Sequence, residues 1–542
     1  NFEVINYRVG AETPLDMGVA IVGVLIGIEL ARRVVGSVFV IIGTLMLLYG
    51  VYGSYMPDLI AHAGETFPGL CTSLLYTCDG IFGIMANVLA TYVILFVLFG
   101  AFLEKCGAQK FFIDFPLAAV GHKVGGPGKV AVIASGLFGS ISGSAIANTV
   151  STGAFTIPLM KRAGFKPHVA GAIEPAASIG GMFLPPVMGA GGFLMAELTE
   201  TSYAYIMMIA VFPALLYFFS VFCMIHFEAK KQGIKGIDDD DFPHWKEVLK
   251  KQWYFSLPLV VITILMIMGK SPGFAAFWAT AACILVSWVK KETRMGPREI
   301  WDAIQIGARN TLIVGATMGV IGVIVGTISL TGMGLKFSDL IISMAGGNLF
   351  IALVLVAIAS LVLGMGVPVT AAYLIVAVLA VPALGDLGVA VIAAHMIVYW
   401  LSQDSNITPP VCVAAYAGAA IAGSDPWKTG WTAFKFAKML YIMPLLFAFV
   451  PAMLLEGSIT DILVAYFSAI MGTIVFCSFA IGYARRKTTW LEWGILGIAS
   501  LLLYWPGILT DVVGLALAGL VYWMQRDAAK LADQSVGVTQ PE

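Results

Sequence analysis

The stretch Gly136–Gly192 decides the fold. It reads GLFGSISGSAIANTVSTGAFTIPLMKRAGFKPHVAGAIEPAASIGGMFLPPVMGAGG. It is apolar, yet glycine and proline interrupt it where a membrane-spanning helix should be continuous. A weaker copy follows from Ser360 to Tyr416. Paired, interrupted apolar segments at corresponding positions are typical of carriers that bind their cargo between two repeats.

Four residue pairs with one common spacing relate the two segments. The members of each pair lie 224 positions apart (382 minus 158, for example): Pro158 with Pro382, Pro185 with Pro409, Pro186 with Pro410, and Gly164 with Gly388. A fixed spacing inside two similar segments predicts an internal repeat.

Composition sets the class of protein. The 542 residues are 59% hydrophobic and 12% charged, with a mean hydropathy of +0.91, whereas soluble domains carry about 25% charged residues. We therefore expect an all-α polytopic, multi-pass membrane protein in the lipid bilayer. A net charge of −1 gives a nucleic-acid partner no support.

Other functional classes receive less support. A membrane-embedded enzyme needs a nucleophile–base pair or a metal cluster, but the six histidines are scattered and no HExxH or GxSxG motif occurs. An ion channel also uses re-entrant loops, but it does not need two dissimilar tips, and no filter-like repeat is present. A carrier is the preferred interpretation, and the chain is not expected to be an enzyme.

The apolar runs predict six regions. These are 1–56 (N-terminal spans), 57–128 (scaffold span and connector), 129–227 (first repeat unit), 228–347 (loop and scaffold helices), 348–437 (second repeat unit) and 438–542 (C-terminal spans and tail). We interpret the Asp238–Asp241 run as a solvated loop rather than a metal site. Asn1 is not a typical native start, so we expect an N-terminally incomplete chain.

Positive charge gives the orientation. We place Arg32 and Arg33 in the cytoplasm and require the other Lys/Arg clusters to lie there as well. This requirement is met when the segment 130–158 enters and leaves the membrane on the cytoplasmic side and the segment 350–382 enters and leaves on the outer side. Both segments are then re-entrant helical hairpins, each facing a broken helix, and the two units form an inverted repeat. Cys71 and Cys78 then lie on the outer side of the membrane, and the two alternatives for this pair are a disulfide and two free thiols.

The interruptions carry the candidate chemistry. Ser140–Ser144 breaks the first hairpin and Gly364–Pro368 the second; the facing breaks are Gly180–Pro186 and Asp404–Pro410. Interrupted backbone at membrane depth is tolerated where it lines a cavity. Its carbonyls and hydroxyls suit Na⁺, and half-helix N-termini suit a carboxylate. The alternative is that small residues only allow close helix packing.

Two acidic residues within these segments are candidates for binding. Asp404 lies at the second facing break, where the alternative is that it caps a half-helix beginning near Ile407. Glu174 lies on the first broken helix, where the alternative is an ion pair with Lys166 or His168.

Two basic residues are weaker candidates. His395 is either a hydrogen-bonded interior histidine or a proton carrier. Arg309 either meets a substrate carboxylate or is a charge that flanks a span on the cytoplasmic side.

The chain resembles a known family in several blocks. GLFGSISGSAIANTVSTGAFTIPLMKRAGF, PAASIGGMFLPPVMGAGGFLMAE and SQDSNITPPVCVAAYAGAAIAG are similar to the large membrane subunit of tripartite ATP-independent periplasmic (TRAP) transporters. YGVYGSYMPDLIAH, GIFGI, FVLFGAFLEK and FFID resemble the TAXI branch, in which small and large subunits are often fused. The resemblance covers about 34–456, and the first two spans would be a remnant of the small subunit. The spans after about 457 fit the family less clearly.

The resemblance implies a secondary active importer with an elevator mechanism. A TAXI-type extracytoplasmic binding protein would deliver a small carboxylate, glutamate-like or 2-oxoglutarate-like. A Na⁺ gradient would drive uptake, with proton coupling as the alternative. The implied Na⁺ ligands are Ser142, Ser144, Asn148, Gly181, Leu184 and Pro186 for one site, and Gly364, Gly366, Asp404, Ser405, Thr408 and Pro410 for the other. The candidate substrate contacts are Ser144, Asn148, Glu174, Arg309 and Asp404.

Overall fold

The computed structural model describes residues 11–237 and 244–526, except for the side chain of Ile313. The Asp238–Asp241 run, the first ten residues and the tail beyond Arg526 lie outside these ranges. Within them the chain is helical, and the β-structure is limited to one isolated bridge between Tyr483 and Lys487. The expectation of an all-α protein is confirmed for this part of the chain.

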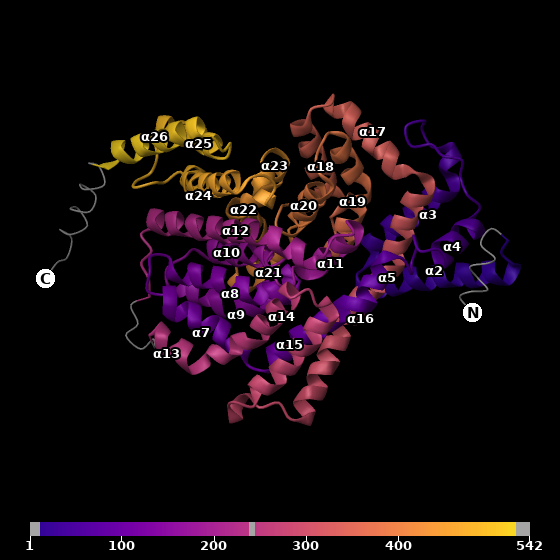
Figure 1. Ribbon diagram of the computed structural model, residues 1–542, viewed down its shortest axis with the longest axis horizontal. Helices are drawn as coiled ribbons and strands as arrows, with labels where there is room; N and C mark the ends of the chain where they lie inside the picture. Colours follow the sequence, from indigo (N-terminus) through magenta and orange to yellow (C-terminus); the bar gives the residue numbers. More distant parts are fainter. Residues whose placement is uncertain (1–10, 238–243, 527–542) are drawn as a thin grey trace. The chain divides into compact units, whose positions relative to one another are not determined.

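The chain divides into two compact units, each assembled from three segments. Unit 1 comprises 1–109, 186–208 and 254–405. Its helices (Figure 1) are α2 (Pro14–Val34), α3 (Ser37–Tyr52), α4 (Phe67–Tyr76), α5 (Ile84–Val88), α6 (Ile94–Lys105), α11 (Gly189–Leu198), α14 (Leu257–Ile267), α15 (Pro272–Ser287), α16 (Pro297–Thr331), α17 (Met333–Ala345), α18 (Leu349–Leu363), α19 (Val369–Asp386) and α20 (Val391–Leu401).

Unit 2 comprises 110–185, 209–253 and 406–542. Its helices are α7 (Ala108–Val120), α8 (Gly126–Ser142), α9 (Ala145–Arg162), α10 (Pro167–Gly180), most of α12 (Tyr203–Gln232), α13 (Trp245–Gln252), α21 (Val413–Ala422), α22 (Pro426–Phe436), α23 (Met439–Phe449), α24 (Ile459–Ile481), α25 (Trp490–Leu503) and α26 (Ile508–Met524). Helix α10 packs against α8, α9, α21 and α22 and so lies at the centre of this unit.

Nine helices in the described ranges are long and apolar enough to cross a membrane. One of them, α16, has 35 residues and is about 52 Å long. That length exceeds the hydrocarbon core of about 30 Å, so α16 extends beyond the apolar layer.

The spacing of 224 residues recurs in the helix boundaries. Helix α9 matches α19 at both ends under this shift, α11 matches α21 at both ends, and α10 and α20 begin at matching residues. Gly164 and Gly388 share a positive φ, as do the non-glycine residues Met188 and Cys412. Two segments that break, turn and restart in step are an internal repeat, as the prolines predicted.

All four expected interruptions are present. Between α8 and α9 the helix stops at Gly143, whose φ is +61°, and Ser144 caps α9 by accepting a hydrogen bond from the Ala147 N–H. Between α18 and α19 the chain turns at Gly366, whose φ is +72°. The facing breaks separate α10 from α11 and α20 from α21. Because glycine adopts positive φ without a steric penalty, it ends these helices readily.

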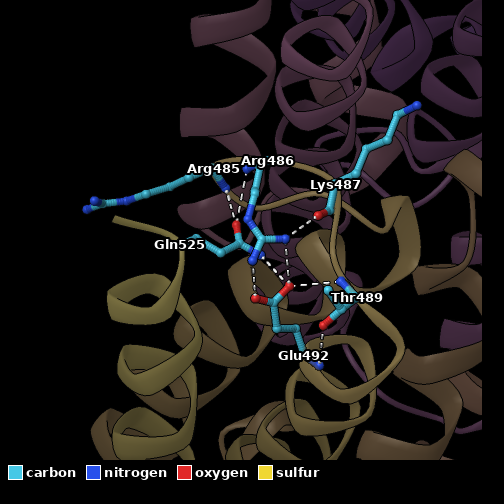
Figure 2. A network of polar contacts seen from close by, with 6 residues as sticks. All are labelled: Arg485, Arg486, Lys487, Thr489, Glu492 and Gln525. Atoms are coloured by element: carbon cyan, nitrogen blue, oxygen red, sulfur yellow. Dashed lines mark hydrogen bonds and ion pairs between the residues drawn. The ribbon is translucent and has the colours of Figure 1, made fainter. Parts of the chain in front are cut away.

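The three C-terminal helices are held together by a buried ionic network (Figure 2). Glu492, in the first turn of α25, is 1% exposed, and its carboxylate accepts hydrogen bonds from both terminal nitrogens of Arg486, at 2.7 and 3.2 Å. Gln525 donates to the same carboxylate at 3.0 Å, while its own oxygen accepts from the Arg485 and Arg486 backbone N–H groups. The network fixes the α24–α25 turn to the end of α26.

All seven cysteines are free thiols in the structure. Cys71 is buried on α4, whereas Cys78 is exposed beyond the end of that helix. Of the two alternatives for this pair, the structure therefore has the free thiols.

Candidate functional site

The first break places an unpartnered hydroxyl beside the two hairpin helices of unit 2. Ser142 ends α8, and its buried Oγ has no hydrogen-bond partner among the described residues. The Ser144 hydroxyl already has one partner, because it caps α9 by accepting a hydrogen bond from the Ala147 N–H. A buried hydroxyl without a partner is costly, and a cation that accepts its lone pairs is one way to satisfy the oxygen.

Asn148 connects this break to α10. Its side-chain nitrogen donates to the carbonyl of Ser135 at 2.9 Å and to that of Ser178 at 3.4 Å. A Cβ at Gly139 would lie 2.6 Å from that nitrogen and 2.8 Å from the Gly181 Cα. The close approach of two glycine backbones thus brings Asn148 and Gly181 together, as the predicted first cation set requires.

Glu174 lies at the centre of a sealed hydroxyl cluster. The side chain is 0% exposed, and its Oε1 accepts a hydrogen bond of 2.5 Å from the Ser135 hydroxyl and another from Thr152. Its Oε2 accepts from Thr156. The alternative of an ion pair with Lys166 or His168 is wrong, because the carboxylate's partners are hydroxyl groups of α8 and α9.

The sequence analysis did not assign Ser135, Thr152 and Thr156 to the site. A signal was present: Asn148, Thr152 and Thr156 follow one another at intervals of four residues, which places their side chains on one face of α9. Ser135 lies one to two turns before the break on α8 and gave no comparable pattern.

The second break, in unit 1, places Ser405 against Gly364. A Cβ at Gly364 would lie 2.9 Å from the Ser405 Oγ, so only a glycine allows this approach. In the first repeat the comparable close approach is between Gly139 and Gly181. Gly181 corresponds to Ser405 under the shift of 224, and Gly139 directly precedes Ser140, which corresponds to Gly364. Ser360, one turn earlier on α18, has a buried hydroxyl with no partner in the described ranges.

Asp404 is 1% exposed, and its Oδ1 has no hydrogen-bond partner in the part of the chain that the structure describes. No α-helix begins near Ile407; a 3₁₀ turn covers Asp404–Asn406 and α21 begins at Val413. The alternative that Asp404 caps a half-helix is therefore wrong. A carboxylate oxygen that is buried and unpaired is strongly destabilising unless a cation or a proton neutralises it.

Tyrosine hydroxyls hold two backbone carbonyls of the predicted sets, those of Pro186 and Pro410. Tyr203 donates to the carbonyls of Pro186 and Val187 at 2.9 and 2.6 Å, and Tyr416 donates to that of Pro410 at 2.6 Å. Tyr441 bonds the hydroxyl of Thr408. Leu184 is half-buried, and Gly366 is exposed.

The boundary between the two units runs through both facing breaks, after Pro185 and after Ser405. Each predicted ligand set is therefore divided. Unit 2 holds Ser142, Ser144, Asn148, Gly181 and Leu184 of the first set and Thr408 and Pro410 of the second, and unit 1 holds the other members: Pro186, Gly364, Gly366, Asp404 and Ser405.

The two basic candidates lie outside these clusters. His395 is buried on α20, and its Nδ1 lies 2.9 Å from the hydroxyl of Tyr373, so the structure has the hydrogen-bonded interior histidine. Arg309 is exposed on α16, which favours a flanking charge over a substrate contact. Among the described residues no group of three or more His, Cys, Asp or Glu side chains could hold a metal ion.

A protein whose described residues form nine candidate spans and an internal repeat of interrupted helices belongs to the class of polytopic membrane carriers. Residues 22–462 match the family described as the tripartite ATP-independent periplasmic transporter, DctM component. The chain belongs to this family. Its members are permeases of the inner membrane rather than enzymes, and they act with a periplasmic substrate-binding protein and a small subunit.

Named relatives cover most of this region. The chain is 23% identical over 368 residues to the 2,3-diketo-L-gulonate TRAP transporter large permease YiaN of Escherichia coli, covering 66% of this chain and 84% of that protein. It is 25% identical over 395 residues to the C4-dicarboxylate TRAP transporter large permease DctM of Pseudomonas aeruginosa, covering 71% and 91%. A solved structure, the Alcanivorax borkumensis YdaH transporter, covers 82% of this chain and 97% of its own at 18% identity, with a TM-score of 0.44.

Proposed function

We propose that this chain is the permease of a Na⁺-driven importer of small carboxylates. The relatives named above transport, by their names, a sugar acid and a C4-dicarboxylate. We extend this chemistry to glutamate-like and 2-oxoglutarate-like substrates, delivered by a binding protein of the TAXI type. The TAXI assignment rests on the motifs within residues 49–62, 80–84 and 96–114.

The observation that supports the Na⁺ proposal most strongly is the unpaired carboxylate oxygen of Asp404. Ser405 and Gly364 adjoin it at the second break, and a buried anion with hydroxyl and carbonyl oxygens nearby is the ligand type that a hard cation prefers. Sodium bound there would neutralise the charge. The corresponding first break offers the Ser142 hydroxyl and the carbonyls near Gly181.

The mechanism that we propose is an elevator with two re-entrant hairpins, α8–α9 and α18–α19, in an inverted repeat. Its support is the repeat itself and the packing of each hairpin's two helices on each other. The two hairpins belong to different compact units, so this motion rests on the family resemblance and on the positive-charge pattern rather than on the division into units.

The test is uptake of labelled glutamate and 2-oxoglutarate into proteoliposomes that hold the full chain and its cognate binding protein. An inward Na⁺ gradient should drive accumulation by the wild type. Asp404→Asn should reduce the apparent Na⁺ affinity by about tenfold or more, since it removes a charge that is worth at least 1.4 kcal/mol in binding. Ser405→Ala should weaken it less.

The matched control is Asp386→Asn, the same substitution at an exposed position at the end of α19, which should leave Na⁺ dependence unchanged. Equal effects of Asp404→Asn and Asp386→Asn, or wild-type uptake that ignores Na⁺, would contradict the proposal.

A further inference from the structure

The Glu174 cluster is a polar feature of unit 2 for which the Na⁺ proposal has no use. It joins three helices: Glu174 on α10, Ser135 on α8, and Thr152 and Thr156 on α9, all buried. A fully buried carboxylate costs several kcal/mol when ionised and unpaired. Such a group is retained in a membrane segment chiefly where it serves a function.

The surrounding helices provide the carboxylate with no counter-ion among the described residues. Their charged or titratable side chains bond elsewhere or are exposed. Four lysines have other partners: Lys129 contacts His226, Lys161 donates to the Ala422 carbonyl, Lys231 donates to the Ile481 carbonyl, and Lys435 donates to Glu228. The Tyr217 and Tyr416 hydroxyls donate to the Ala176 and Pro410 carbonyls. Of the others, Arg162, Lys230 and Lys428 are exposed, and Cys223 and His168 are partly buried. The hydrogen-bond partners of Glu174 are hydroxyl groups, which donate hydrogen bonds to the carboxylate but carry no charge that would neutralise it.

The internal repeat shows that helix packing does not require this cluster. Under the shift of 224 residues, Glu174, Ser135, Thr152 and Thr156 correspond to Val398, Ala359, Val376 and Ala380. Val376, Val398 and Ala380 are buried as well. The second repeat therefore builds the same helix arrangement from apolar side chains, so the polar set of the first repeat has a role besides packing.

The hydrogen-bond pattern fits a carboxyl group in either charge state. When Glu174 is ionised, three hydroxyls donate to it. Each hydroxyl also has a second partner: Thr152 lies 2.7 Å from the Asn148 carbonyl, Thr156 lies 3.1 Å from the Thr152 carbonyl, and Ser135 lies 3.1 Å from the Thr152 hydroxyl. A hydroxyl that rotates toward its second partner can accept a hydrogen bond from a protonated Glu174.

The contacts of the cluster are hydrogen-bonding contacts. Ser135 Oγ lies 2.5 Å from the carboxylate, which is hydrogen-bonding distance. Hydroxyl groups at this distance can hold a carboxyl group with or without its proton.

We propose that Glu174 binds and releases a proton during the transport cycle, so that import by this chain responds to the proton gradient through this residue. The inference deepens the proposed function and rests on it. The proton moves between water and the Glu174 carboxyl group, with no other bond formed or broken, and the hydroxyls of Ser135, Thr152 and Thr156 reorient to suit each state.

The first test reads the site without transport. Dicyclohexylcarbodiimide adds a protonated carboxyl across its C=N bond, and the acylurea that forms is located by peptide mass spectrometry on the full chain in lipid nanodiscs. Labelling of Glu174 should rise about tenfold or more between about pH 9 and about pH 6. Glu228, which is also buried (8% exposed) but lies 2.8 Å from the Lys435 amine, should remain unlabelled. Labelling of Glu174 that is absent or constant across this range would overturn the proposal.

The second test separates this proposal from the proposed function. At a fixed Na⁺ gradient, an inward proton gradient should stimulate glutamate or 2-oxoglutarate uptake by the wild type several-fold. It should not stimulate uptake by Glu174→Gln. The control Glu197→Gln, which changes an acidic residue of unit 1, should respond as the wild type does. Wild-type uptake that needs Na⁺ but ignores protons would overturn the role of Glu174 and leave the proposed function standing. Because labelling is done on the wild type, a Glu174→Gln chain that fails to fold does not weaken the test.

Discussion

Gly139→Ala is expected to destabilise unit 2, although alanine is the better helix former. The added Cβ would lie 2.6 Å from the Asn148 side-chain nitrogen and 2.8 Å from the Gly181 Cα, both shorter than ordinary van der Waals contact. Asn148 cannot turn away freely, because it donates hydrogen bonds to α8 and α10. The substitution therefore has to separate α8 from α10 or displace Asn148.

The magnitude follows from three contributions. Overpacking of a close contact costs about 1–3 kcal/mol, and loss of one Asn148 hydrogen bond costs about 0.5–1.5 kcal/mol. Replacing a helical glycine by alanine returns about 0.5–1 kcal/mol. The net loss is about 0.5–4 kcal/mol, and at about 2–4 °C per kcal/mol the midpoint of thermal unfolding should fall by about 1–16 °C.

The assay is thermal unfolding of the detergent-solubilised chain, followed as loss of the monodisperse peak in size-exclusion chromatography. The matched control is Gly494→Ala on α25, also a helical glycine of unit 2 but with nothing within 4 Å of the added Cβ. This control should unfold at the wild-type temperature or slightly above it. If both variants unfold at the same temperature, the close approach of α8 and α10 is not a real constraint and the reasoning fails.

Two further substitutions test other contacts. Tyr203→Phe removes the hydroxyl that holds the Pro186 and Val187 carbonyls and should lower stability by about 1–2 kcal/mol, measured as thermal unfolding; an unchanged midpoint would show that these carbonyls find other partners. Glu492→Gln breaks the pair with Arg486, whose side chain is 32% exposed, so the loss should be about 1–3 kcal/mol rather than the larger value of a fully buried pair. High salt screens the ion pair of the wild type, so the difference in unfolding midpoint between the wild type and Glu492→Gln should become smaller as salt is added.

Local signals in the sequence predicted the interruptions well, because glycine and proline act on the backbone of their own neighbourhood. Gly143 and Gly366 end α8 and turn the α18–α19 break with positive φ, as the sequence led us to expect. The partners of Glu174 were not predictable in the same way. Ser135 is 39 residues from it in sequence, so only the packing of α8 on α10 determines that the two side chains meet, and an ion pair with nearby Lys166 or His168 was the natural local guess.

The repeat also explains why the two candidate sites should not be treated as equivalent. The shift that superimposes the helix boundaries places Asp404 on Gly180 and Glu174 on Val398, so each repeat has one buried carboxylate that the other lacks. The two acids differ in their surroundings: Asp404 Oδ1 has no hydrogen-bond partner in the described ranges, whereas both Glu174 oxygens accept hydrogen bonds. A buried, unpaired carboxylate oxygen requires a cation or a proton, and a carboxyl surrounded by reorientable hydroxyls accommodates a proton. Under the two proposals above, Asp404 takes part in binding Na⁺ and Glu174 binds a proton, so two halves with matching helix boundaries serve different cations through the one carboxylate that each half does not share.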